Sequence, residues 1–156
     1  QIGHLADIAA PALLISMAVG RIGDIINGEH IAKATDLPWG FIYSNPASLS
    51  YQVYGLGRSH PAVGYEMIWD IIALAIMWPL RNRIRPYGMF FALYLSLYSL
   101  GRFFISFVRE DKIWLLEFDM AQLVALVVLA ISVSLLIYKA QLVRDIQRPG
   151  GRTSTE

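Results

Sequence analysis

The sequence contains no cysteine among its 156 residues. This excludes disulfide bonds, thiolate metal sites and a cysteine nucleophile supplied by the chain itself. Charged residues are scarce, at 16% of the chain against about a quarter in soluble domains, and 56% of the residues are hydrophobic. The mean hydropathy is +0.48, and the net charge of +1 is too small to indicate a nucleic-acid partner. The composition therefore indicates a membrane protein.

The first residues of the sequence do not show the pattern of a cleavable signal. Residues 1–7 carry no basic cluster, and the first residue is Gln1 rather than Met. The chain is therefore expected to be either a fragment of a longer protein or a natural short form.

Hydrophobic runs predict four membrane spans, because a helix needs about 20 mostly apolar residues to cross a bilayer core of about 30 Å. The runs cover residues 5–22, 62–80, 88–108 and 118–138. The first run is weaker, since it contains Asp7, Pro11 and Arg21. A span is expected there, with a re-entrant or surface helix as the alternative. The predicted fold class is an all-α polytopic membrane protein.

The distribution of basic residues orients these spans. Residues 81–87 contain three arginines and the tail after Tyr138 contains four basic residues, whereas residues 109–117 have two basic residues against three acidic ones. The positive-inside rule places residues 81–87 and the tail in the cytoplasm. Residues 1–140 are thus predicted to form one transmembrane domain, followed by a partly disordered cytoplasmic tail at 141–156. Residues 23–61 are expected to form an outer loop region, in which proline and glycine punctuate short β pieces.

Polar residues inside a span are costly, on the order of 2.5–3.5 kcal/mol each for a charge at the helix centre, so they mark candidate sites. The first group lies in GRIGDIINGE, at residues 20–29. Arg21 and Asp24 are three residues apart and can interact on a helix, and Asn27 and Glu29 add a donor and a second carboxylate. The alternative interpretation is an interfacial cap, in which Arg21 reaches the membrane surface and Asp24 neutralises it.

The second group lies in HPAVGYEMIWD, which begins the second span. His60 precedes the span, Tyr65 and Glu66 follow within it, and Asp70 is four residues after Glu66. Residues four apart lie on one helix face, so the two carboxylates need a cation opposite them. A structural role, in which these acids balance an arginine inside the bundle, is at least as well supported as a catalytic one.

The third group is a polar stripe in YLSLYSLGRFFISFVRED. Tyr94, Tyr98, Arg102 and Ser106 recur every four residues, and Arg109 follows seven residues after Arg102.

A guanidinium as deep as that of Arg102 needs an anion, either Glu66, Asp70 or a ligand phosphate. Arg109 is expected near the surface, as an interfacial anchor or as a phosphate contact. In the last span, Gln122 is expected to form an interhelical hydrogen bond.

The predicted topology gathers these groups in the outer half of the bundle. Arg21 leaves the first span toward the outside, Glu66 enters the second span from the outside, and Arg102 lies in the outer half of the third. Two arginines that converge beside tyrosines and an apolar wall would suit a phospholipid headgroup whose acyl chains stay in the bilayer. A transporter fragment is disfavoured, because the inner halves of the spans are almost wholly apolar.

Several motifs resemble the prolipoprotein diacylglyceryl transferase family. GRIGDIINGE is similar to its signature, roughly G-R-x-G-N-F-x-N-G-E, and HPAVGYEMIWD to H-P-S-Q-L-Y-E with an acid four residues on. GRFFISFVRED is similar to F-R-x-x-x-E-F-F-R-x-x-D, and TDLPWG, RPYGMF and MAQL also fit. The resemblance extends from residue 5 to about residue 140.

This resemblance implies a bacterial inner-membrane enzyme whose active site faces the periplasm. Such enzymes transfer a diacylglyceryl group from phosphatidylglycerol to the lipobox cysteine of a prolipoprotein signal peptide and release glycerol phosphate. The expected partners are therefore phosphatidylglycerol, the prolipoprotein and membrane lipids, with no cofactor and no metal. Catalytic roles are expected for Arg21, Arg102 and Glu29. Substrate binding is expected for the same three and for Asp24, Asn27, His60, Tyr65, Glu66, Tyr98 and Arg109.

The sequence also departs from the family pattern. Asp24 stands in place of an asparagine, Ser106 in place of a glutamate, and residues 62–64 in place of S-Q-L. The N-terminal spans of the family carry a His-Gly-Gly motif, whose histidine is the proposed base, and residues 1–20 contain no match. His60 and His30 are available as bases, but the favoured role for His60 is to shape the entry to the second span, and His30 is expected to be exposed. The alternative function is a non-catalytic membrane protein that binds phospholipid headgroups.

Overall fold

A computed structural model describes residues 2–110, 113–115 and 118–142. Within these residues, four helices are long and apolar enough to cross a membrane. They are α1 (Ile2–Asn27), α3 (Ala62–Met77, extended by the 3-10 turn η1, Trp78–Leu80), α4 (Met89–Ser106) and α5 (Met120–Lys139). The predicted all-α polytopic class is confirmed, and the last two spans begin within two residues of their predicted starts.

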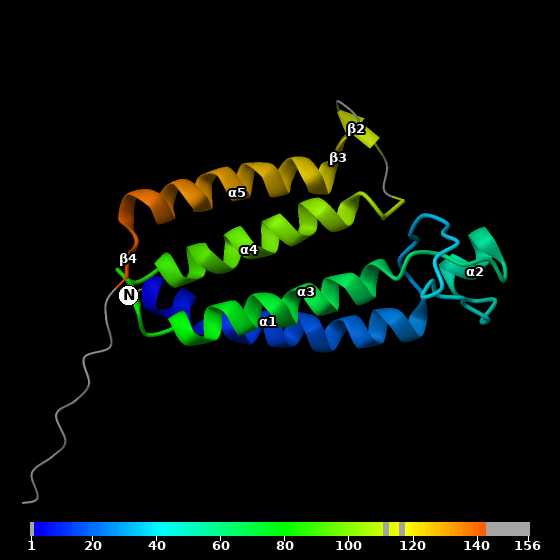
Figure 1. The fold of residues 1–156 in the computed structure, drawn as a ribbon, viewed down its shortest axis with the longest axis horizontal. Helices are drawn as coiled ribbons and strands as arrows, with labels where there is room; N and C mark the ends of the chain where they lie inside the picture. Colours follow the sequence, from blue (N-terminus) through cyan, green and yellow to red (C-terminus); the bar gives the residue numbers. More distant parts are fainter. Residues whose placement is uncertain (1, 111–112, 116–117, 143–156) are drawn as a thin grey trace, which may run out of the picture.

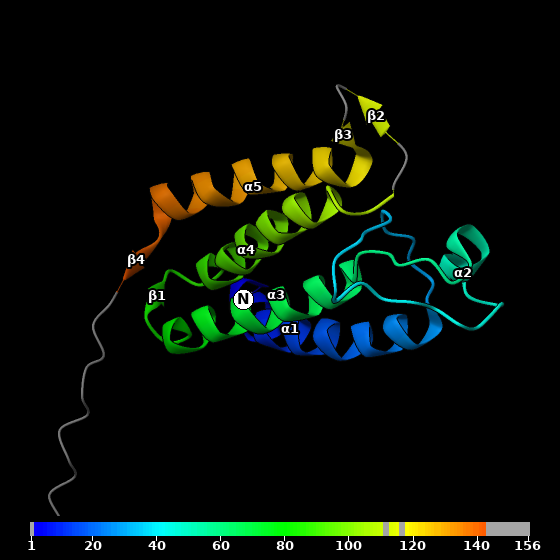
Figure 2. The same ribbon diagram turned by 45° about the vertical axis from the view of Figure 1, so that its right-hand side comes forward.

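The four helices form two pairs. α1 packs against α3, and α4 packs against α5 (Figure 1). The turned view in Figure 2 shows the same two layers, which meet where α3 and α1 contact α4. The core at this junction consists of Ala10, Leu14, Ala73, Met77, Phe90 and Tyr94. Many of the other large apolar side chains are exposed, as expected for a protein whose helix surfaces face lipid.

The first helix is longer than the predicted span at 5–22. It continues through GRIGDIIN and ends at Asn27. Arg21 and Asp24 pair within this additional part of the helix, and Gly28 follows its last residue. Gly28 has φ 64°, and its N–H donates to Asp24 O at 2.9 Å, which closes the last turn in the left-handed conformation that favours glycine. Most of the signature motif therefore lies on a rigid helix, and only its end lies in a loop.

Asp7 has a structural role at the opposite end of the bundle. Its carboxylate accepts hydrogen bonds from the backbone N–H groups of Gly88 at 2.8 Å and Phe91 at 2.9 Å. These donors belong to the start of α4, where helix N–H groups have no partner within the helix. Asp7 therefore caps α4 from the neighbouring α1, which explains an acidic residue in the first span.

The β structure of the outer region at 23–61 consists of short pieces, as predicted. Among the described residues its β pairing consists of the isolated bridges Ala32–Arg109, Ala34–Ser59 and Phe41–Ser59. It also contains a short helix that the sequence pattern did not predict, α2 (Leu49–Tyr54), which the Ser48 side chain caps.

The named strands lie elsewhere. β2 (Ile113–Leu115) pairs with β3 (Phe118–Asp119) before α5, and β1 (Ile84–Arg85) pairs with β4 (Gln141–Leu142). The predicted tail therefore begins as a strand, and the disorder predicted beyond it lies outside the described residues.

Helices α3 and α4 are in close contact at Gly101, next to Arg102. A Cβ atom at Gly101 would lie 2.1 Å from Trp69 Cδ1, and the Trp69 indole N–H donates to Leu97 O at 2.8 Å. The indole is therefore fixed against the α4 backbone. Adding a methyl group at a position packed this tightly typically lowers the stability of the fold by about 1–3 kcal/mol.

We therefore expect Gly101→Ala to lower the free energy of unfolding by about 1–3 kcal/mol and to displace Arg102 relative to α3. Gly20→Ala is the matched control, because a Cβ built at that helical glycine meets no described atom within 4 Å apart from its chain neighbours and the local backbone of its own helix. Unfolding of both variants in detergent micelles measures the difference. Equal stability of the two variants would show that the Trp69–Gly101 contact is not restrictive.

Candidate active site

Two arginines from separate helices meet at one carboxylate. Arg21 on α1 places Nη2 2.7 Å from Glu66 Oε2, and Arg102 on α4 places Nη1 2.6 Å from Glu66 Oε1. The Glu66 side chain is 6% exposed, whereas those of Arg21 and Arg102 are 20% and 21% exposed. A buried carboxylate on α3 thus holds two partly accessible guanidinium groups together. The structure identifies Glu66 as the partner for Arg102 that the sequence left open.

Further charged groups extend this cluster. Arg21 Nη1 also contacts Asp24 Oδ2 at 2.8 Å, and His30 Nε2 lies 3.4 Å from the same oxygen. Arg109 places Nη1 3.5 Å from Glu66 Oε1 and Nη2 3.5 Å from His30 Nδ1. We call Arg21, Asp24, His30, Glu66, Arg102 and Arg109 the outer charge cluster.

Two sequence-based expectations are wrong at this site. Arg109 lies beyond the end of α4, so it does not continue the helical stripe. Its side chain is only 9% exposed, so it is not an anchor at the surface. His30 was expected to be exposed, but its side chain is 31% exposed and contacts the cluster.

Both deviations have the same cause, because the outer loop region covers the end of α4. Lys33 N–H donates to Val108 O at 2.9 Å, and Glu110 N–H to Ile31 O at 3.3 Å.

A second contact fixes this cover. The hydroxyl of Tyr54, on α2, donates to the carboxylate of Glu110. Burial, followed by the neighbouring Glu110, raises the pKa of Tyr54 to about 12, so the phenol keeps its proton near neutral pH. The short helix α2 is thereby tied to the residues that follow α4, which positions the backbone next to Arg109.

Several buried polar atoms at the site have no hydrogen-bond partner among the described residues. They include Arg21 Nε, Asp70 Oδ2 and Ser106 Oγ. Leaving such a group unpaired costs about 1–3 kcal/mol, and more for a charged group. Arg21 therefore contacts two carboxylates through its terminal nitrogens and still has an N–H group that can donate to an oxygen anion.

Two cavities adjoin the cluster and share Arg102. A small one of about 10 Å³ lies between α1, α3 and α4 and is lined by both Arg21 and Arg102, together with Glu66 and Asp70. A larger one of about 590 Å³ lies between α4 and α5. Its lining is mostly apolar, with Leu95, Val124 and Val128 among its residues, and Asp119 at one end.

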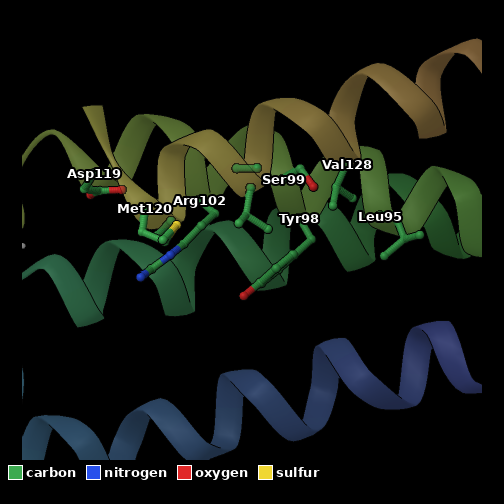
Figure 3. Close-up of a pocket in the computed structure, with 10 residues that line it drawn as sticks. Leu95, Tyr98, Ser99, Arg102, Asp119, Met120 and Val128 are labelled. Atoms are coloured by element: carbon green, nitrogen blue, oxygen red, sulfur yellow. The ribbon is translucent and has the colours of Figure 1, made fainter. Parts of the chain in front are cut away.

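Figure 3 shows Tyr98 and Arg102 extending from α4 in the same direction, with their polar ends away from the α4–α5 pair. Arg102 thus connects an apolar cavity with the charged groups on α1 and α3.

The remaining predicted site residues lie around the cluster. Asn27 Nδ2 donates to Glu29 Oε1 at 3.0 Å on the exposed side of the turn after α1. His60 and Tyr65 lie together, with ring centroids 6.3 Å apart, and the Tyr65 hydroxyl accepts a hydrogen bond from Trp39 Nε1 at 2.9 Å.

Gln122 completes a capping box with Asp119 at the start of α5, and its side-chain Nε2 donates to Phe103 O on α4 at 3.5 Å. The expected interhelical contact of Gln122 is thus present.

The geometry is suited to binding an amphiphile with a phosphate. Guanidinium groups bind phosphate oxygens through paired N–H donors, and two of them on separate rigid helices fix one position for the anion. An apolar cavity that begins at one of these arginines offers space for a hydrocarbon chain.

Comparison with known proteins identifies a family and several relatives. The family described as prolipoprotein diacylglyceryl transferase matches residues 1–138. The chain is similar to proteins named phosphatidylglycerol–prolipoprotein diacylglyceryl transferase from three bacteria. Identity is 35% over 139 residues for Dehalococcoides mccartyi strain BAV1 (89% of this chain, 52% of the relative) and 33% over 151 residues for Thermosynechococcus vestitus (94% and 56%). It is 36% over 134 residues for Clostridium novyi (85% and 51%). The chain spans about half the length of the curated relatives it matches.

Proposed function

The chain belongs to the prolipoprotein diacylglyceryl transferase family, and we propose that it takes part in transferring diacylglyceryl groups from phosphatidylglycerol to prolipoproteins. The names of its relatives support this activity. The main structural support is the meeting of Arg21 and Arg102 at Glu66, beside a cavity that suits an acyl chain. The acceptor is the lipobox cysteine of the prolipoprotein signal peptide, and the surroundings are the lipids of the bacterial inner membrane.

The reaction requires a cationic site for the leaving group. The thiol sulfur attacks the glyceryl carbon of phosphatidylglycerol and forms a C–S bond, while the C–O bond to phosphate breaks. The electron pair of this C–O bond goes to the phosphate oxygen, and glycerol phosphate departs with one additional negative charge. The thiol releases one proton, which balances this additional charge. Preplaced N–H donors that bind this oxygen more strongly as its charge grows accelerate the step.

The catalytic roles follow from these positions. Arg21, through Nε, and Arg102 bind the phosphate, and Glu66 fixes the separation of their guanidinium groups. Glu29 orders the loop next to the headgroup through its contact with Asn27.

Substrate binding extends over the surrounding side chains. Arg109 and Asp24 set the charge on the outer side of the phosphate, and Tyr98 borders the path to the acyl cavity. His60 and Tyr65 shape the entrance from the outer loop region.

Orientation follows from charge. The arginines at 81–87 lie at the end of the bundle opposite the outer charge cluster, and by the positive-inside rule this supports a site that faces the periplasm. The prolipoprotein cysteine reaches the same side once its signal peptide has inserted.

A second candidate function is phospholipid binding without transfer. Asp24 supports it, because this acid contacts Arg21 at 2.8 Å at the position where the family has an asparagine. An additional carboxylate on the phosphate-binding arginine weakens its attraction for an anionic ester.

Labelled lipid distinguishes the two functions. The protein, at its full encoded length, is reconstituted with phosphatidylglycerol labelled in its diacylglyceryl part and with a lipobox peptide. Transfer predicts label on the peptide through a thioether, equimolar glycerol phosphate, and no label on a Cys→Ser peptide. Label that is retained by the protein but absent from the peptide would support the binding function, and absence of both would contradict each proposal.

A further inference from the structure

A third cavity lies at the end of the bundle opposite the outer charge cluster. Its volume is about 580 Å³, and it is lined by residues from the beginning of α1, from η1, from the connection between α3 and α4 and from the start of α4. These segments lie together at one end of the bundle (Figures 1 and 2). Glu66 and Met77 on α3 are eleven residues apart, which corresponds to roughly 16 Å along a helix axis. This cavity is therefore separate from the proposed transfer site.

Two arginines line this cavity, and each is stacked on an aromatic ring. The guanidinium carbon of Arg81 lies 4.4 Å from the centroid of the Trp78 ring, and that of Arg85 lies 4.6 Å from the centroid of the Tyr87 ring. Stacking restricts the arginine side chain but uses only the face of the guanidinium group. Its N–H donors lie in the plane and still point outward, in the fork that matches a phosphate.

The acidic residue in the cavity has another function. Asp7 also lines it, but both oxygens of its carboxylate accept backbone N–H groups at the start of α4. A carboxylate at a helix N-terminus is stabilised by the helix dipole, so its charge is matched there. Two arginines against one aspartate leave the cavity with a net positive charge.

Apolar side chains of the membrane-spanning helices form another part of the lining. Ile8 and Pro11 on α1 and Phe90 on α4 form this part, and Phe90 belongs to the bundle core. Trp78 and Tyr87 are 52% and 55% exposed, as aromatic residues at a membrane interface usually are. A lining with both arginines and apolar side chains fits a lipid better than a free anion, because a free anion would leave the apolar side chains without a partner.

From these contacts we infer that the cavity binds an anionic phospholipid of the leaflet opposite the proposed transfer site. Its phosphate lies between Arg81 and Arg85, and the first carbons of an acyl chain run along Ile8, Pro11 and Phe90. The lipid bridges α1 and the start of α4, which Asp7 already connects. It is a bound structural lipid and not a substrate, and the inference does not depend on the transfer reaction.

Lipid retention on the purified protein tests this inference. We compare wild type, R81Q/R85Q and R83Q by native mass spectrometry after exchange into detergent with phosphatidylglycerol or phosphatidylcholine. R83Q removes one charge from the same connection, but Arg83 does not line the cavity. Wild type and R83Q are expected to retain one more phosphatidylglycerol than R81Q/R85Q, with no such difference for phosphatidylcholine. Equal retention by all three proteins would overturn the inference.

Two additions distinguish this lipid site from the transfer site and from a simple anion site. R102Q, at the transfer site, is expected to leave the second lipid in place, so failure of one site does not imply failure of the other. Inorganic phosphate at saturating concentration is expected not to displace the lipid; displacement would show that the cavity binds anions without regard to the acyl chain, and would overturn the inference.

A label provides a readout that does not depend on removing the arginines. The chain has no cysteine, so Asn82→Cys places a single reactive thiol in the cavity lining. A fluorophore there is expected to be quenched more strongly by nitroxide-labelled phosphatidylglycerol than by the same label on phosphatidylcholine. Equal quenching by the two lipids would contradict specific binding.

Discussion

Arg102→Ala is expected to lower the rate of diacylglyceryl transfer by about 10²–10³-fold, as removal of one preplaced donor to a developing oxyanion does in other enzymes. Arg102 contacts the buried Glu66 at 2.6 Å and lines both the small polar cavity and the apolar cavity between α4 and α5. Its removal therefore takes away a cation where the phosphate and the acyl chain are proposed to meet. The rate is measured with phosphatidylglycerol vesicles and a lipobox peptide, per amount of folded protein.

Two further variants show whether charge alone is sufficient. Arg102→Lys keeps the charge but loses the planar fork of donors, so its rate is expected to lie between those of wild type and Arg102→Ala. Arg83→Ala removes a cation at the opposite end of the bundle and is expected to keep the wild-type rate. A wild-type rate for Arg102→Ala would remove this arginine from the mechanism.

Glu66→Ala is expected to lower the free energy of unfolding by about 3–5 kcal/mol, the usual cost of removing one partner from a buried ion pair. Glu66 lies within 3.5 Å of three arginines, from α1, from α4 and from the residue stretch after α4. Without its carboxylate, these cations repel one another in a site from which water is partly excluded. The helices that carry them should then separate at the outer end.

The measurement is equilibrium unfolding in micelles, followed by helix content. Asp36→Ala is the matched control, because Asp36 is an acid in the outer loop region, away from the bundle core, and it is expected to change stability by less than about 0.5 kcal/mol. Glu66→Gln retains the shape and should fall between the two. If Glu66→Ala were as stable as the control, the carboxylate would not be what holds the arginines together.

The sequence was sufficient to predict the four membrane-spanning helices, since long apolar runs have few alternatives in a membrane. It also predicted which helix faces carry charge, because Glu66 and Asp70 are four residues apart and both are buried on α3. The pairing of Arg21 with Asp24 followed from their spacing in the same way. In each of these cases one helix is enough to define the geometry.

Contacts between distant segments could not be read from local patterns. His30 and Arg109 join the outer charge cluster only because the outer loop region folds over the end of α4, through backbone pairing that no side-chain pattern encodes. Asp7 similarly looked like an unfavourable charge in a span, and its role is visible only when α1 lies next to the start of α4. The extension of α1 to Asn27 was not predicted, because charged residues such as Arg21 and Asp24 are typical of the end of a membrane span.

The most direct test of the central claim is a double-mutant cycle on the affinity for phosphatidylglycerol, using Arg21→Gln, Arg102→Gln and the double variant. If both arginines bind one phosphate, their effects are coupled, and the free-energy losses should depart from additivity by about 1 kcal/mol or more. Losses that add within about 0.3–0.5 kcal/mol would show that the two residues act independently, and would contradict a shared phosphate site.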